Sequence, residues 1–409
     1  MKTIMKRRHW IITLAACLSI GLAIPAAADE APKSIRIGWS LAKTGPNAPG
    51  ADTTLRPNYE MWVKEVNAAG GLMLKAYGKR VPIEVVEYDD RSSTEEAVRA
   101  IDRLISQDKV DLILPPWGTA VNLAVAPMLA KHGYPQLGST SLTDKAAEFA
   151  KRWPSIFFML GSGGSYAEAL MSQLDAARKA GKIGDKVAML YVADGFGVDA
   201  ATAARKAAAA HGFKLVLDKS YPVGTQDLSP LVNQVKGLSP DVFIAFSYPP
   251  DTVLISDQSR VLSFNPKIFY TGVGTQFPFF KAKYGAGAEG QMSLGGVDGD
   301  SQLIKEYFKR HKDLTGKEPD SWGSPVTYAS LQVLQQSIER VGKIDRPAIL
   351  REIKAGSFET VLGPIKFENQ QLSGIFLVGQ WQNGVFQGVG PSAIKGAKPA
   401  VIPKPAWKN

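Results

Sequence analysis

Short apolar strands and amphipathic helices alternate along most of the chain, and this alternation limits the folds that it can adopt. Apolar segments at residues 35–40, 81–88 and 110–114 are typical of buried strands, and each is followed by apolar residues at helical spacing. The pattern starts again near residue 155 and continues to residue 270. Repeated strand–helix units are typical of doubly wound, mainly parallel sheets, so we expect an α/β fold with two similar lobes.

Turn and end signals place the first elements. Residues 41–52 contain two glycines and two prolines and are predicted to be a loop. A helix is predicted over residues 55–69, stopped by the glycine pair that follows it. Another is predicted over residues 93–107, where Ser93 is a candidate cap with Glu96 three residues further on.

The C-terminal part is less regular. Helices are predicted over residues 301–314, 328–341 and 347–355, and short strands follow them. The segment from Pro391 is rich in Pro, Lys and Ala and has no hydrophobic period. We therefore expect residues 391–409 to be poorly ordered.

The first 28 residues have the composition of a secretory signal peptide and are excluded from the predicted fold. Four basic residues precede an apolar run from Trp10 to Pro25, and three alanines precede Asp29. A membrane anchor is one alternative, but the run is shorter than the roughly 20 residues that a span needs. Lipid attachment at Cys17 is another, although the apolar run continues beyond that residue. The sequence therefore predicts an exported protein.

Cleavage after Ala28 would leave a mildly basic chain without cysteine. It removes four basic residues and no acidic one, so the formal net charge falls from +10 to +6. A chain without thiols suits an oxidising compartment and excludes a disulfide scaffold. The remaining Lys and Arg are interspersed with Asp and Glu, without a basic stripe that contains aromatic residues, so no nucleic-acid partner is expected. No second long apolar run occurs, which predicts a soluble mature protein.

The sequence offers no catalytic, metal or cofactor motif. His132, His211 and His311 are expected at or near helix ends, on the surface, and are not spaced as metal ligands. The glycine-rich segment 161–164 lacks the pattern of a phosphate loop, and the pair at residues 89–90 fits a turn at a strand end better than a metal site. We therefore expect no catalytic residue, no metal and no cofactor, and an enzyme of the α/β class is the disfavoured alternative.

Aromatic and hydroxyl side chains gather where the predicted strands end. In open α/β sheets, ligands bind at the carboxyl ends of the strands. The rings could instead plug the edge of a sheet, but their recurrence at six strand ends favours a binding site with apolar walls and with donors for a carboxylate or another acceptor. The sets are Trp39 and Ser40; Trp117, Gly118 and Thr119; Gly138, Ser139, Thr140 and Ser141; Asp194, Gly195 and Phe196; Ser247 and Tyr248; and Gly272, Val273 and Gly274.

Several short motifs occur in an order that resembles a known family. They are IRIG at 35–38, TGP at 44–46, NAAGGL at 67–72, EYDD at 87–90, PQLGS at 135–139, YVADGFG at 191–197 and VLGP at 361–364. Together with the leader, this series resembles the type I periplasmic solute-binding proteins of ABC importers, of which the leucine/isoleucine/valine-binding proteins are typical. The resemblance extends over nearly the whole chain after the leader.

The resemblance implies two Rossmann-like lobes joined by a three-strand hinge, with the ligand in the cleft between them. It places lobe 1 at residues 29–150 and about 291–355, and lobe 2 at residues 151–290 and about 356–390. It also implies a monomer in the periplasm that closes on a small solute and delivers it to the membrane subunits of a permease. A sensor of the same fold, with no role in transport, is the alternative that the sequence leaves open.

The family's binding residues can be carried over by position. The donor loops of lobe 1 match Trp117, Gly118 and Thr119, and then Ser139, Thr140 and Ser141. The aromatic residues of lobe 2 match Phe196 and Tyr248, while Trp39 and Gly272 complete the expected ligand-binding set.

One expected group is missing from this set. Amino-acid binders of the family hold the ligand's ammonium group with an acidic residue on the next strand end, which here is the uncharged segment 270–274. A buried ammonium without a counter-charge is costly. The sequence therefore favours a solute bound through a carboxylate or amide and without an ammonium, such as an aromatic acid. Asp194 or Asp251 could replace the missing acid, which keeps an amino acid as the alternative.

Overall fold

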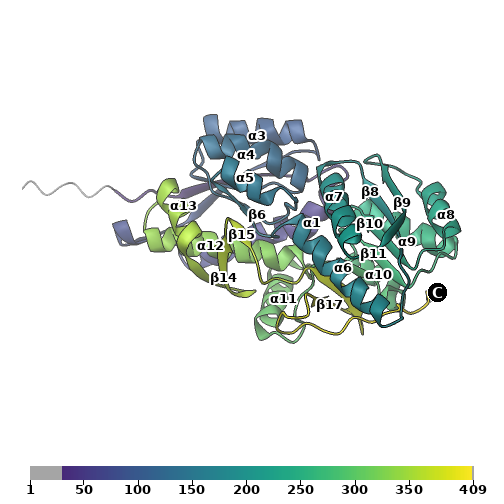
Figure 1. Ribbon diagram of the computed structural model, residues 1–409. Coiled ribbons are helices and arrows are strands. Elements are labelled where there is room, and N and C mark those ends of the chain that lie inside the picture. Colours follow the sequence, from purple (N-terminus) through teal and green to yellow (C-terminus); the bar gives the residue numbers. More distant parts are fainter. Residues whose placement is uncertain (1–29, 408–409) are drawn as a thin grey trace, which may run out of the picture.

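The computed structural model describes residues 30–407, which form two lobes side by side (Figure 1). The predicted leader, including Cys17, lies outside the described residues. Each lobe is a β-sheet packed against helices, and both sheets are built mainly from parallel strands at their centres. This architecture confirms the predicted α/β fold with two lobes.

Lobe 1 contains two groups of hydrogen-bonded strands. Parallel pairing joins β4 (Ile83–Asp89), β1 (Ile35–Leu41) and β5 (Leu112–Leu114) in that order. The second group is ordered β13 (Ser357–Thr360), β14 (Gly363–Glu368), β15 (Gln371–Leu372), β7 (Ile156–Phe158) and β6 (Gln136–Gly138), and a separate hairpin is formed by β2 (Leu72–Leu74) and β3 (Lys79–Val81). The helices are α1 (Ala48–Thr54), α2 (Arg56–Ala68), the 3-10 turn η1 (Lys75–Tyr77), α3 (Thr94–Ser106), α4 (Thr119–Lys131), α5 (Ala146–Arg152), α11 (Gln302–Thr315), α12 (Gly323–Val341) and α13 (Arg346–Ala355).

Lobe 2 is built on one seven-stranded sheet. Its order is β17 (Val385–Gly390), β16 (Val378–Gln382), β12 (Met292–Leu294), β11 (Ile268–Thr271), β10 (Val242–Phe246), β8 (Lys186–Val192) and β9 (Lys214–Tyr221). The last two strands in sequence pair antiparallel, and the others pair in parallel. The helices are α6 (Gly163–Lys179), α7 (Gly195–Ala210), α8 (Ser229–Gly237), α9 (Pro249–Val261), α10 (Pro278–Tyr284) and the 3-10 turn η2 (Gly285–Ala288).

The chain crosses between the lobes three times, at residues 159–162, 295–301 and 373–377. Two of these positions differ from the sequence-based boundaries. The strand β7 pairs with β6, so lobe 1 extends beyond residue 150, and β13 to β15 join the same sheet, so residues 357–372 belong to lobe 1 and not to lobe 2. Apolar pattern identifies a strand but not its pairing partner, which explains both differences.

The central strands are buried on both faces, as parallel sheets covered by helices require. All five residues of β10 are buried, and in β1 only one residue is half-buried. The predicted cap of α3 is confirmed, because the Ser93 side chain accepts a hydrogen bond from the Glu96 N–H. Part of the predicted loop 41–52 is instead helical: α1 begins at Ala48, with a proline in its first turn, a position that proline tolerates.

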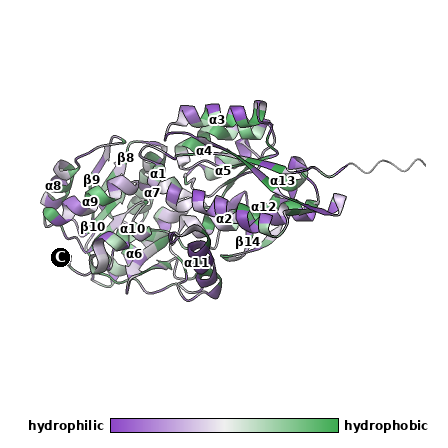
Figure 2. Ribbon diagram, turned by 180° about the vertical axis from the view of Figure 1, so that it is seen from behind, coloured by the Kyte–Doolittle hydropathy of each residue, from purple (hydrophilic) through white to green (hydrophobic). Residues whose placement is uncertain are grey.

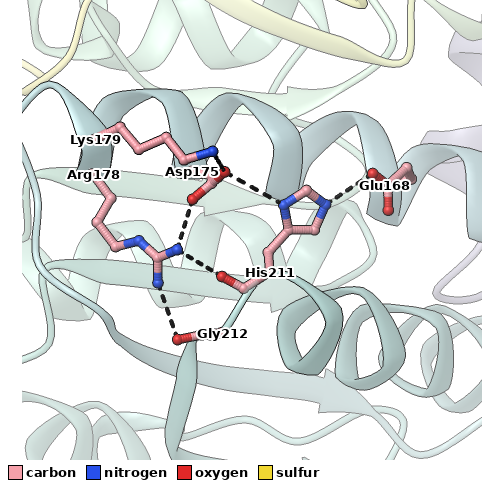
Figure 3. A network of polar contacts seen from close by, with 6 residues as sticks. All are labelled: Glu168, Asp175, Arg178, Lys179, His211 and Gly212. Atoms are coloured by element: carbon pink, nitrogen blue, oxygen red, sulfur yellow. Dashed lines mark hydrogen bonds and ion pairs between the residues drawn. The ribbon is translucent and has the colours of Figure 1, made fainter.

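A polar network joins the end of α6 to the end of α7 on lobe 2 (Figure 3). Arg178 pairs with Asp175 and donates to the main-chain carbonyls of His211 and Gly212. The His211 Nε2 atom lies 2.8 Å from a carboxylate oxygen of Glu168. This histidine is the C-cap residue of α7 and therefore lies at a helix end, as the sequence predicts.

The segment after β17 is packed against lobe 2, which contradicts the expectation of a poorly ordered tail. The Trp407 ring lies between two cations, with the Arg260 guanidinium 4.2 Å and the Lys404 ammonium 3.4 Å from its centre, and its Nε1 donates to the Phe264 carbonyl. Burial lowers the pKa of Lys404 to about 7. Trp407, near the end of this segment, holds the segment against lobe 2. No periodic pattern in the sequence indicates this contact.

Helix α11 is largely hydrophilic (Figure 2) and buries only three residues, one of which is His311. The imidazole Nδ1 lies 2.9 Å from the Lys317 carbonyl, and the ring packs 5.8 Å from that of Tyr307. Burial lowers the pKa of His311 below its ordinary value of 6.5. The sequence prediction of a surface histidine is therefore wrong for this residue.

This burial predicts a loss of stability in mild acid. Below about pH 6.5 the unfolded chain binds a proton at His311 more readily than the folded chain does. The free energy of unfolding therefore decreases as the pH is lowered, by at most about 1.4 kcal/mol per pH unit. In His311→Asn, whose amide can donate to the same carbonyl, this component should be absent. Urea unfolding at several pH values between 7.5 and 5 measures the difference between the two proteins. Taking the difference removes the contribution of buried Asp90, whose pKa is raised to about 6 and which acts in the opposite direction. Parallel pH profiles for the two proteins would contradict the prediction.

Candidate functional site

Four helices point their N-termini at the contact between the two lobes. They are α4 and α12 from lobe 1 and α7 and α9 from lobe 2. Residues of the first turn of α4, α7 and α12 and the N-cap residue of α9 line one small cavity, together with residues that follow neighbouring strands. Its lining is Thr54, Trp117, Gly118, Thr119, Ser139, Thr140, Leu142, Leu160, Phe196, Tyr248, Val273, Trp322 and Gly323.

Aromatic rings fill most of the space between the lobes. The Trp117 ring of lobe 1 lies 5.4 Å from the Tyr248 ring of lobe 2, and the Phe196 ring stacks on the Tyr248 ring at a distance of 5.3 Å. The cavity that remains has a volume of about 30 Å³. The lobes also touch at the Thr143 hydroxyl, which donates to a carboxylate oxygen of Asp199 at 2.5 Å. The structure therefore shows the lobes closed on each other.

The hydroxyl groups of lobe 1 are held by neighbouring main-chain groups. The Thr119 hydroxyl accepts from the Leu142 N–H at 3.0 Å, and the Thr140 hydroxyl accepts from the Gly118 N–H at 3.1 Å. The Trp117 Nε1 atom donates to the Thr54 hydroxyl at 3.0 Å. These bonds fix the orientation of the donors and of the Trp117 ring before any ligand arrives.

Three of the four helix N-termini already carry a carboxylate. The Asp194 side chain accepts from the Gly197 N–H in the first turn of α7, and also from the Tyr248 hydroxyl at 2.7 Å. At α9 the carboxylate of Asp251 accepts from the Tyr248 N–H, and at α12 that of Asp320 accepts from the Gly323 and Ser324 N–H groups. Burial raises the pKa of both Asp251 and Asp320 above the ordinary value.

The N-terminus of α4 is different, because within residues 30–407 its N-cap carries no side-chain hydrogen bond to the first turn. Its N-cap is Gly118, whose φ of 91° is a conformation that favours glycine. Uncapped first-turn N–H groups at a helix N-terminus form an anion site, since they can donate and the helix dipole favours negative charge. This is the place in the cleft where the geometry suits a ligand carboxylate.

The structure brings seven of the ten predicted ligand-binding residues together around this cavity: Trp117, Gly118, Thr119, Ser139, Thr140, Phe196 and Tyr248. The other three lie elsewhere. Trp39 is a core residue packed 5.5 Å from the Tyr59 ring, Ser141 is buried behind its loop, and Gly272 bonds to the Ser247 hydroxyl inside the sheet of lobe 2. None of these three lines the cavity, contrary to the expectation. For Trp39 the reason is that side chains along a strand alternate between the two faces of the sheet, and the Trp39 ring lies on the face that packs against Tyr59.

Six further residues line the cavity. Val273 belongs to one of the strand-end sets of the sequence analysis, and the other five were not predicted: Thr54, Leu142, Leu160, Trp322 and Gly323. Trp322 is the largest of them and precedes α12, which no predicted strand introduces. Its Nε1 atom donates to the Tyr166 hydroxyl of lobe 2 at 3.0 Å. Only the order of the motifs along the chain, which implies a return to lobe 1 near this point, could have pointed to it.

Two features weighed in the sequence have structural roles. The predicted strand-end turn is confirmed: the Asp89 carboxylate accepts from the N–H groups of Lys43 and Arg91, and Asp90 accepts from Ser92. In residues 30–407 no group of three or more acidic, histidine or cysteine residues is placed to hold a metal ion. No helix in that range is long and apolar enough to cross a membrane.

Comparison with known proteins decides the family. The model of the family described as "Periplasmic binding protein" matches residues 34–385, which is most of the chain. The chain belongs to the periplasmic binding protein family. This result confirms the predicted class of function, a solute-binding protein of ABC transporters, and an extracytoplasmic location for this periplasmic binding protein.

Curated relatives and solved structures agree with that assignment. The Leu/Ile/Val-binding protein homolog 7 of Brucella suis is 27% identical, over 94% of this chain and 97% of its own length. Among solved structures, a solute-binding protein from R. palustris in complex with benzoate has a TM-score of 0.76 at 18% identity, and covers 90% of this periplasmic binding protein and 99% of that chain. The isoleucine complex of LivJ from Streptococcus pneumoniae has a TM-score of 0.74 at 21% identity, with coverages of 91% and 100%.

Proposed function

We propose that this protein is the receptor of an ABC importer for a small aromatic carboxylate without an ammonium group. The uncapped N-terminus of α4 carries the proposal, since it is the anion site of the cleft. The carboxylate of the ligand would lie there, and its ring would lie against the rings of Trp117, Phe196 and Tyr248.

The carboxylates near the cleft support the absence of an ammonium group. Asp194, Asp251 and Asp320 all accept hydrogen bonds from main-chain N–H groups, and none of them lines the cavity. A ligand ammonium would be buried without a counter-charge, which costs several kcal/mol. The proposal therefore does not use Asp194 or Asp251 in place of the missing acid.

The structural neighbours bound to benzoate or to 3,4-dihydroxybenzoic acid support this class of ligand. Entry of such a ligand requires the lobes to separate, because the cavity of about 30 Å³ is too small for a ring. Opening would part the rings of Trp117 and Tyr248, and closure around the ligand would then present the closed form to the permease. We further propose that the protein acts as a monomer after removal of residues 1–28.

A thermal-shift panel tests the ligand class. Benzoate should stabilise the protein, by about 2.7 kcal/mol at 100 times its dissociation constant. Leucine and phenylalanine should not stabilise the protein, because each carries an ammonium group. Benzyl alcohol should not stabilise it either, because it lacks the carboxylate. Stabilisation by leucine with none by benzoate would overturn the proposal and show that another group pairs with an ammonium.

A charge placed at the N-terminus of α4 should compete with the ligand. We expect Ala120→Asp to weaken benzoate binding about tenfold or more, because an aspartate in the first turn takes the same N–H groups and repels the ligand carboxylate. The control is Ala120→Asn, which has the same shape without the charge and should retain most of the affinity. Isothermal titration calorimetry measures both variants, and equal affinities for benzoate would place the ligand carboxylate elsewhere in the cleft.

A further inference from the structure

A second cavity, of about 680 Å³, lies beside the hinge. Two of the three connections between the lobes contribute to it, through residues 296–301 and 374–376. The remaining walls are the first turn of α11, the start of α12, the turn between β13 and β14, and the segment after β17. Both lobes therefore form this cavity, which is defined here as the hinge cavity.

The inner walls of the hinge cavity are apolar. Val297, Trp322, Val326, Val361 and Phe376 line it and are all buried in the protein around it. A wall of this composition, in a cavity within the usual range of 300–1,000 Å³ for small-molecule sites, is suited to an apolar molecule.

The charged groups of the hinge cavity balance at its rim. Asp300 pairs with Lys398 at 2.6 Å, and the remaining lining charges are one carboxylate, Asp298, and one exposed ammonium, Lys395. A charged molecule would lose its hydration against the apolar walls without finding a net counter-charge. The fitting ligand is therefore uncharged, unlike the carboxylate proposed for the cleft.

Trp322 connects the hinge cavity with the cleft, because its side chain lines both. The ring is held tightly: a Cβ atom added at Gly295 would lie 1.9 Å from it, and its Nε1 donates to Tyr166 of lobe 2. Because Trp322 borders both spaces, a movement of its ring that accommodates a molecule in one of them changes the shape of the other.

The hinge connections can change conformation at their glycines. Gly295 and Gly296 precede α11 with φ angles of 81° and 112°, and Gly374 has a φ of 75°. Because the cavity walls come from both lobes, rotation about these connections must change its shape. The structure contains this cavity together with the closed contact between Trp117 and Tyr248.

We propose that the hinge cavity is a second binding site, for a small uncharged aromatic or aliphatic molecule, and that its occupancy favours the closed conformation. A molecule that fits this shape stabilises the conformation that encloses the cleft ligand, so the two ligands strengthen each other's binding. By thermodynamic linkage, the strengthening is by the same factor in both directions, and couplings of this kind are typically about 5- to 150-fold. The coupling rests on the proposed function of the cleft, whereas the binding site itself does not.

The uncharged fluorophore N-phenyl-1-naphthylamine is a suitable probe of the site. It should bind with saturation at one molecule per chain. The substitutions Leu303→Trp and Ile375→Trp each place a larger side chain in the cavity wall, and each should weaken probe binding at least tenfold. The matched control is Val385→Trp, because Val385 is 43% exposed, close to the 47% of Leu303, and does not line the cavity. This substitution should leave probe binding unchanged. Saturating benzoate should not displace the probe, which shows that the probe is not in the cleft.

The coupling is measured in the same titrations. Saturating benzoate should raise the affinity for the probe at least fivefold, and saturating probe should raise the affinity for benzoate by the same factor. Probe binding that survives both cavity substitutions, or that benzoate displaces, overturns the site. Two ligands that bind independently overturn the coupling. Failure of benzoate to bind overturns the proposed function instead, while the substitutions still decide whether the hinge cavity binds the probe.

Discussion

Replacing Trp117 with alanine is expected to weaken the binding of benzoate by about 30-fold or more. The ring forms the lobe 1 side of the contact with Tyr248 and is fixed by its hydrogen bond to the Thr54 hydroxyl. Truncating a central aromatic residue of this kind typically costs about 2 kcal/mol or more of binding free energy. Isothermal titration calorimetry of the variant and the unchanged protein measures the loss.

Two controls separate binding from folding. Trp153, which stacks on Phe149 in lobe 1 and does not line the cleft, offers the same substitution at another place, and Trp153→Ala should keep full affinity. Tyr248→Phe keeps the ring and removes only the bond to Asp194, so it should lose less than Trp117→Ala. Unchanged affinity for benzoate in both Trp117→Ala and Tyr248→Ala would show that the cleft site is assigned to the wrong residues.

Removing the segment after residue 390 is expected to destabilise lobe 2 by about 3–5 kcal/mol, because the half-buried Trp407 ring is lost together with the hydrogen bonds of the segment's main chain. The segment contributes the Trp407 ring between two cations, and its main chain bonds to Lys267, Gly388 and Gln380. Its loss would also uncover Arg260, whose guanidinium now packs on the rings of Tyr284 and Trp407. Urea unfolding, followed by circular dichroism, measures the change.

A point substitution tests whether the aromatic residue is responsible. Trp407→Ala should cost about 2 kcal/mol, less than for a fully buried ring because this ring is only half-buried. Lys395→Ala, at an exposed position of the same segment, is the control and should change the stability by less than about 0.5 kcal/mol. Equal stability of all three proteins would mean that the packed segment does not stabilise lobe 2.

Much of the site follows from the sequence, because parallel strands bring their carboxyl ends to the same edge of a sheet. Trp117, Phe196 and Tyr248 each follow a strand end along the chain, and the structure places all three rings around one cavity. The same rule did not predict the position of Trp39, which packs against Tyr59 in the core. The rule locates the end of a strand but does not say which face of the sheet a side chain occupies.

Site residues that do not follow the end of a strand could not be predicted from the positions of the strand ends. Trp322 reaches the cleft only because the chain returns from lobe 2 to lobe 1 before α11 and α12. The boundary near residue 356 was misplaced because β13 to β15 join the sheet of β7, which is far away in the sequence. Trp407 was assigned to a disordered tail, since its fixed position depends on Arg260 and Lys404 and not on any local pattern.

By itself, the sequence determined the alternation of strands and helices, the family, and the residue types at the strand ends, because these depend on local periodicity and on the order of motifs. Only the tertiary structure decided which lobe each strand joins, which helix N-terminus is left without a carboxylate, and that a hinge cavity shares Trp322 with the cleft. These features depend on contacts between segments distant in the chain, and no local pattern records which segments will meet.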